Sequence, residues 1–160
     1  MKIYWRKTGG AWIATTIKNS KRGNSTKDKP EPDFKVEDLS QKLLQIEGDY
    51  VCIPFREAPI CMVINMDGKL HNPQNIIFAP RVTLNDCHNK SVRYWKRFPK
   101  KYHFVTGFAY DNKHKMWIRH SWLLEKNNII VETTPFKREK YFGFISDKES
   151  AKLFYKMFTG

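Results

Sequence analysis

The stretch "MWIRHSWLLEKNNIIVETTPF", residues 116–136, decides the fold. It alternates along two segments that flank a polar turn, which predicts a β-hairpin. Residues two apart on a strand share a face, so His120 and Trp122 point the same way. A three-residue loop at 126–128 would set Trp122 opposite Glu132, which places that carboxylate diagonally next to the imidazole. A two-residue loop would turn Glu132 to the other face, so the His–Glu pair requires a loop of odd length.

The segments around this hairpin complete an α+β pattern. Residues 86–98 carry Val92, Trp95 and Phe98 at helical spacing, which predicts a helix with a buried apolar stripe and a basic outer face. Further strands and a closing helix are expected at 102–111, 139–146 and 147–158. A helix followed by an antiparallel meander predicts an α+β fold, with the helix packed on an antiparallel sheet.

The opening half of the chain has shorter signals. Apolar runs predict strands at 2–7, 11–17, 49–55, 58–70 and 75–80. Residues 34–47 predict a helix that ends at Gly48. Residues 18–33 are rich in Lys, Ser, Asn and Pro without apolar periodicity, which predicts a basic mobile loop. We expect one α+β domain over residues 1–160.

Composition and charge limit the function. The 41% hydrophobic share can fill a core, which excludes disorder throughout the chain. No apolar run approaches the ~20 residues that span a bilayer, so no membrane contact is expected. The net charge of +13 predicts an anionic substrate or partner, such as an acidic protein, a phosphorylated ligand or nucleic acid. Residues 1–29 hold eight Lys/Arg against one Asp, so about half of this charge lies near the N-terminus.

Three cysteines differ in their surroundings. Cys52 and Cys61 lie in apolar, strand-like runs, where a free thiol packs as a small hydrophobe. Cys87 lies in the polar sequence "TLNDCHNKS", at the start of the predicted 86–98 helix. The odd number of cysteines and the absence of a signal-like opening segment predict a reduced, cytoplasmic setting.

Cys87 has the local setting of a nucleophile. Free N–H groups and the positive dipole end at a helix start lower the pKa of a thiol. The neighbouring Asp86 opposes that effect, whereas Lys90 and Arg93 favour it. A thiolate also needs a base held in one tautomer, and the His120–Glu132 pair of the hairpin would supply one.

The order of these residues matches a family pattern. Cys87 at a helix start is followed by "HSW" at 120–122 and by "ETT" at 132–134. This order resembles the catalytic half of the transglutaminase-like and papain-like thiol enzymes, in which Cys precedes His and then Asp, Asn or Glu. The resemblance covers about residues 80–146. Glu stands where transglutaminase-like domains usually have Asp, and His88 stands where an aromatic residue usually follows the cysteine.

The resemblance implies roles for four residues. Cys87 would be the nucleophile, His120 the general base and acid, and Glu132 the carboxylate that orients the imidazole. Trp122 would shield the pair from water, within a papain-like or transglutaminase-like core. No cofactor or metal is expected.

Further residues are candidates for substrate contact. His88 is expected to contact substrate or solvent, because neighbours at a helix start point in different directions; the alternative is that His88 is itself the base for Cys87. Asn85 and Gln74 are candidate side-chain donors for an oxyanion hole, together with the backbone N–H of Cys87. Basic residues expected to form a contact surface are Lys90, Arg93, Lys96, Arg97, Lys137 and Arg138. A zinc site from Cys87, His88 and His120 is an alternative use of the same cluster.

Three functions follow from these patterns. The first is a cysteine-dependent hydrolase or acyl transferase acting on an amide, isopeptide or thioester bond. The second is a non-enzymatic basic module that binds nucleic acid or an acidic protein. The third is a small inhibitor or effector that blocks a partner by shape and charge. Loss of function on replacing Cys87 separates the first from the other two.

Overall fold

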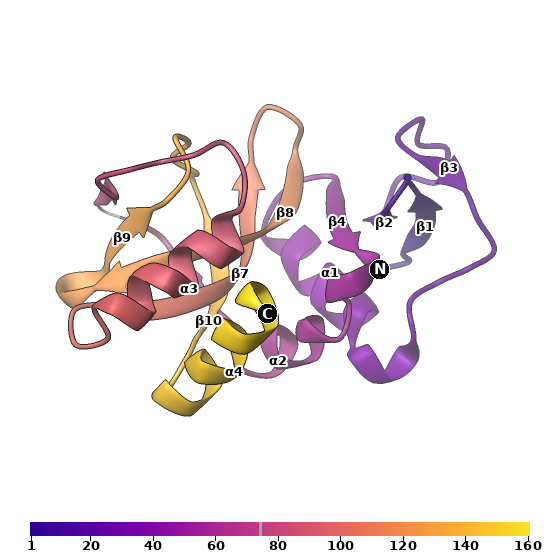
Figure 1. The fold of residues 1–160 in the computed structure, drawn as a ribbon. Coiled ribbons are helices and arrows are strands. Elements are labelled where there is room, and N and C mark those ends of the chain that lie inside the picture. Colours follow the sequence, from indigo (N-terminus) through magenta and orange to yellow (C-terminus); the bar gives the residue numbers. More distant parts are fainter. Residues whose placement is uncertain (74) are drawn as a thin grey trace. The chain divides into compact units, whose positions relative to one another are not determined.

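The computed structural model describes residues 1–73 and 75–160 (Figure 1). It is an α+β structure with helices and a mostly antiparallel sheet, as the sequence predicts. Its contacts divide the chain into two compact units. The first contains Met1–Gly68 and Ala109–Arg119, and the second contains Lys69–Phe108 and His120–Gly160.

The first unit is built on a sheet of short strands. In chain order its elements are β1 (Tyr4–Lys7), β2 (Ala11–Thr15), β3 (Asn24–Ser25), α1 (Val36–Ile46), β4 (Tyr50–Pro54) and α2 (Ile60–Asp67), with 3₁₀ turns at Pro32–Phe34 and Phe55–Glu57. The strand order is β3-β1-β2-β4, and β4 pairs in parallel with the opening residues of β8 (Met116–Glu125). Val36, Leu39 and Leu43 face its core from α1, at the spacing that predicted this helix.

The second unit contains every described residue of the predicted thiol site. Its elements are β5 (Lys69–His71), β6 (Ile76–Phe78), α3 (Cys87–Arg97), β7 (His103–Asp111), β8, β9 (Ile129–Glu132), β10 (Tyr141–Ile145) and α4 (Lys148–Thr159). Of β7 this unit contains the residues up to Phe108, and of β8 the residues from His120 onward. The strand order is β5-β10-β7-β8, and β9 lies between β8 and β6. Helices α3 and α4 lie side by side (Figure 1).

Helices α3 and α4 are fixed to the sheet by different chemistry. The hydroxyl of Ser91 on α3 donates to the Ser121 carbonyl at 3.3 Å and lies 3.0 Å from the Thr133 hydroxyl. Phe154 of α4 packs its ring against Phe104 of β7, with centroids 5.7 Å apart. The polar contacts hold α3 over β8 and β9, which brings the start of α3 to the hairpin.

The register of the β8–β9 hairpin confirms the odd-length loop. A three-residue 3₁₀ turn, Lys126–Asn128, joins the strands, and Glu125 pairs with Ile129. Asn127 and Asn128 have φ values of 66° and 59°, a left-handed conformation that asparagine tolerates better than most residues.

Three expectations differ from the structure. Residues 60–67 form helix α2 rather than part of a 58–70 strand, because Ile60, Cys61 and Ile64 are buried at helical spacing. Phe98 lies past the end of α3 and is 43% exposed, so the buried stripe stops at Trp95. The segment 18–33 contains β3, which pairs with β1 and so is not irregular throughout.

Among the described residues, the helices are too short or too polar for any of them to cross a bilayer.

Candidate active site

Cys87 is the first residue of α3 and is partly exposed. Asp86 precedes it in a left-handed conformation, with φ 72°, and its carboxylate makes no capping hydrogen bond. The Asp86 carbonyl accepts the first helical bond from the Lys90 N–H at 3.0 Å. The thiol therefore lies beside N–H groups that the Asp86 side chain leaves unbonded, where the helix dipole favours a negative charge.

His120 and Glu132 form a buried hydrogen-bonded pair, as the hairpin register predicted. The imidazole Nε2 lies 2.8 Å and 3.1 Å from the two carboxylate oxygens of Glu132. His120 is 4% exposed and Glu132 is 0% exposed. Their mutual attraction is therefore little screened by water.

Two further residues hold the Glu132 carboxylate. The Thr134 hydroxyl donates to Oε2 at 2.8 Å, and the Tyr141 hydroxyl is also hydrogen-bonded to the carboxylate. Burial, reinforced by the nearby carboxylate charge, raises the pKa of Tyr141, so the phenol stays protonated and donates. The Tyr141 oxygen accepts from the Arg138 N–H at 3.1 Å. A buried carboxylate needs such donors to offset its lost hydration.

The Cys87 thiol is hydrogen-bonded to the His120 imidazole. Because Glu132 engages Nε2, we infer that Nδ1 is the ring nitrogen that meets sulfur. Burial alone would raise the pKa of the thiol, but hydrogen bonds and positive charge from His120 and His88 outweigh it and lower the pKa to about 5. Burial would likewise lower the pKa of His120, but the Glu132 charge and the contact with Cys87 raise it to about 9. A thiolate and an imidazolium therefore coexist at neutral pH.

His88 is a second imidazole on the same thiol, contrary to the expectation that it points elsewhere. It is hydrogen-bonded to Cys87, while its Nδ1 lies 2.5 Å from the Ser121 hydroxyl. The Ser121 hydroxyl also lies 2.8 Å from that of Thr106. Stacking on Phe158, with centroids 4.8 Å apart, fixes the ring plane.

Trp122 covers the His120 imidazole. Its indole stacks on the His120 ring with centroids 5.9 Å apart and contacts Tyr141 edge-on at 4.9 Å. Trp122 is fully buried. Gly143 makes room for it, because a Cβ there would lie 2.7 Å from the indole. This packing keeps water from the side of the His–Glu pair that the indole covers.

The other predicted contact residues occupy varied places. Asn85 is exposed just before α3, and Gln74 lies outside the described residues. Lys90, Arg93 and Arg97 line one groove beside α3. Lys96 instead lies over the Tyr155 ring, and Lys137 over the Phe78 ring. Arg138 reaches the site through its backbone bond to Tyr141.

The pKa values of the other two cysteines are shifted in the opposite direction from that of Cys87. Burial raises the pKa of Cys52, and it raises that of Cys61 to about 11. All three thiols are free. Within residues 1–73 and 75–160, no cluster of three or more His, Cys, Asp or Glu side chains has an arrangement that would hold a metal ion.

Four residues of this network were not predicted from the sequence to be functional: Thr106, Ser121, Thr134 and Tyr141. Thr134 follows Glu132 by two residues and so shares its face, which is a readable signal. Ser121 and Thr106 come together only when β7 and β8 pair, and Tyr141 arrives from β10. Their roles follow from tertiary contacts that local pattern does not encode.

Comparisons with protein-family models, with curated proteins and with solved structures found no match for this chain.

Proposed function

We propose that this protein is a cysteine-dependent acyl hydrolase or acyl transferase with Cys87 as its nucleophile. The observation that carries the proposal is the hydrogen-bonded chain Cys87–His120–Glu132. It supplies an ionised thiol, an imidazolium that is hydrogen-bonded to the sulfur, and a carboxylate that is hydrogen-bonded to the imidazolium. The order of these residues and the helix packed on a sheet support a papain-like or transglutaminase-like core.

The reaction begins when the Cys87 thiolate attacks a carbonyl carbon of an amide, isopeptide or thioester. A C–S bond forms and the carbonyl oxygen becomes an oxyanion. The backbone N–H of Cys87 at the helix start is the proposed donor to that oxyanion. When the tetrahedral intermediate collapses, the bond to the leaving group breaks, and Nδ1–H of His120 protonates the departing amine or thiol. The product of this step is an acyl-thioester on Cys87.

The second half of the reaction regenerates the thiolate. Neutral His120 removes a proton from water or from an acceptor amine, which attacks the thioester carbon. The C–S bond breaks, and a carboxylic acid or a new amide leaves. Glu132 stabilises the imidazolium that forms in each cycle and keeps Nε2 engaged, so that Nδ1 faces sulfur. Free thiols suit such an enzyme to a reducing, cytoplasmic setting.

Competitive alkylation tests the proposal. At pH 7 a thiol of pKa about 5 is almost wholly ionised, whereas one of pKa about 11 is ionised in about one molecule in ten thousand. The weaker nucleophilicity of the less basic thiolate removes roughly two and a half to three powers of ten of that advantage. Cys87 should therefore react with iodoacetamide about ten to forty times faster than Cys61, before burial of Cys61 slows it further.

The measurement is peptide mass spectrometry of each cysteine after timed alkylation of the folded protein. Cys87→Ser is the control, since it should remove the fast phase and leave Cys52 and Cys61 unchanged. Alkylation of Cys87 at or below the rate of the other two would overturn the nucleophile assignment. It would favour the non-enzymatic binding module or inhibitor instead.

A further inference from the structure

A basic groove runs along α3, the helix that begins with the proposed nucleophile Cys87. It has a volume of about 420 Å³ and is formed by one face of α3 and by the loop that precedes this helix. Arg81 contributes a cation from the loop, and Lys90, Arg93 and Arg97 contribute three from the helix. Asp86 is the only carboxylate in its lining. The groove therefore carries a net positive charge and suits an anionic ligand.

The charged residues of the groove form a single stripe that begins at the N-cap of α3. Lys90, Arg93 and Arg97 are separated by three and four residues, which places them one above another on the helix, and Asp86 precedes the helix four residues before Lys90. At a rise of 1.5 Å per residue the stripe is roughly 16 Å long. An extended peptide advances about 3.3 Å per residue, so roughly five residues would span the stripe. Cys87 adjoins Asp86 at one end of it.

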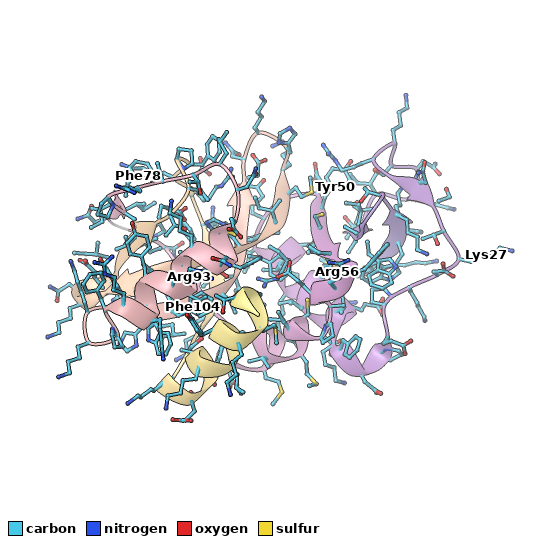
Figure 2. All side chains as sticks on the ribbon, viewed as in Figure 1. Lys27, Tyr50, Arg56, Phe78, Arg93 and Phe104 are labelled. Carbon is cyan, nitrogen blue, oxygen red and sulfur yellow. The ribbon has the colours of Figure 1, made fainter. Side chains whose placement is uncertain are left out.

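The cations of this stripe are arranged for contact with a ligand. The Arg93 Nε donates to the Asn89 side-chain oxygen at 2.7 Å, which fixes the stem of an otherwise exposed guanidinium on α3 (Figure 2). A guanidinium presents a planar fork that matches a carboxylate in bidentate geometry. Lys96, on the same helix, lies over the Tyr155 ring and does not line the groove.

We propose that this groove binds an acidic segment of a polypeptide substrate and presents a neighbouring carbonyl to Cys87. This inference rests on the proposed acyl chemistry. A polypeptide fits the groove better than a nucleic acid for two reasons, one chemical and one structural. Thiolate attack requires a carbonyl carbon, which polypeptides offer at every residue and a phosphodiester backbone lacks. The groove also changes sign along its length, with Asp86, the residue before Cys87, at one end and the cations of Arg93 and Arg97 farther along.

The change of charge sign along the groove determines where the acidic residues of the substrate would lie. A carboxylate next to the reacting carbonyl would meet Asp86, and like charges at close range repel. Carboxylates two to five residues away would meet Lys90, Arg93 and Arg97. The preferred substrate therefore has an uncharged residue at the reacting bond and an acidic run displaced to one side of it.

Fluorescence anisotropy with a fluorescein-labelled pentaglutamate peptide tests the proposal. The Cys87→Ala protein is used so that no chemistry occurs, and a pentaglutamine peptide and a labelled oligothymidylate serve as comparison probes. Reversing two groove charges with Arg93→Glu and Arg97→Glu should weaken pentaglutamate binding about tenfold, because two attractive surface pairs are lost and each reversal adds repulsion. Lys96→Glu changes the charge of the same helix outside the groove and should alter binding less than about twofold.

A second readout connects the groove to the thiol. In the unmodified protein, saturating pentaglutamate should slow iodoacetamide alkylation of Cys87, and pentaglutamine should not. Equal pentaglutamate binding by the Arg93→Glu/Arg97→Glu and Lys96→Glu proteins would overturn the inference. So would groove-dependent binding of the oligothymidylate without binding of the peptide. Slow alkylation of Cys87 without any peptide refutes the proposed function separately, since peptide binding is measured without the thiol.

Discussion

Replacing His120 with alanine should raise the pKa of the Cys87 thiol. The thiol pKa of about 5 lies four units below its ordinary value of 9.0, and hydrogen bonds and charge from two imidazoles oppose the effect of burial. His120 lowers the thiol pKa more than His88 does, so its loss should remove at least half of the total lowering. The thiol pKa should then rise by about two units or more, to about 7 or above.

The assay is the pH dependence of iodoacetamide alkylation at Cys87, followed by mass spectrometry. The unmodified protein should show a rate that rises with a midpoint near pH 5 and is level through neutral pH. The His120→Ala protein should show a midpoint at about pH 7 or higher. The midpoint is compared rather than the rate, because a more basic thiolate is also more nucleophilic.

Two controls separate the electrostatic effect from loss of structure. His103→Ala removes an exposed histidine from β7 and should leave the midpoint unchanged. His120→Gln keeps a polar side chain beside Glu132 and should shift the midpoint in the same direction as alanine, with the thermal midpoint recorded for every variant. An unchanged midpoint in both folded His120 variants would refute the assignment of His120 as the partner of the thiol.

The other predictions concern the same network. Glu132→Gln should lower the pKa of His120 from about 9, because its counter-charge is lost while burial remains, and NMR titration of the imidazole would detect this shift. A His120 pKa that stays near 9 would contradict the ion pair. His88→Phe should keep the stacking on Phe158 yet raise the alkylation midpoint of Cys87 by less than the His120 variants do, whereas a larger shift would make His88 the principal partner. The pKa of His120 is raised in the fold, so its stabilisation is complete below its ordinary pKa of 6.5 and is lost as pH rises through about 9; the pKa of Cys87 is lowered, so its stabilisation is complete above 9.0 and is lost as pH falls through about 5. The two changes cancel between pH 6.5 and 9, so the unfolding free energy contributed by the pair should rise by about 2 kcal/mol from pH 5 to 6.5 and then stay level. Urea unfolding of the unmodified protein and of Cys87→Ala across this pH range measures the difference. A difference between the two proteins that falls over pH 5 to 6.5 would contradict the signs.

The hairpin could be predicted from sequence because a strand has a fixed period of two. Once the loop Lys126–Asn128 is known to be odd in length, the register follows, and the faces of His120 and Glu132 follow with it. The position of Cys87 at a helix start was also readable, since the polar residues before it and the apolar spacing after it mark a helix boundary. These local rules were sufficient to nominate the three residues.

Other parts of the fold depend on information that local pattern lacks. Residues 60–67 form a short apolar run, which fits a buried strand and a buried helix equally well. Exposure of Met62 and Met66 distinguishes the two, and that exposure is a property of the packed structure. The contact of His88 with the thiol also depends on Ser121, which reaches the imidazole from a strand far along the chain. The hydrogen bond that Tyr141 donates to Glu132 from β10 cannot be predicted from local sequence for the same reason.

Acyl transfer to Cys87 tests most directly whether this thiol is a nucleophile. The folded protein is exposed briefly to p-nitrophenyl acetate, and the acetylated residue is located by mass spectrometry while release of p-nitrophenol is followed by absorbance. We expect a burst of p-nitrophenol and an acetyl group on Cys87 that is later lost to water, and we expect neither event in Cys87→Ala. Acetylation that spares Cys87, or that proceeds equally well in His120→Ala, would contradict this expectation.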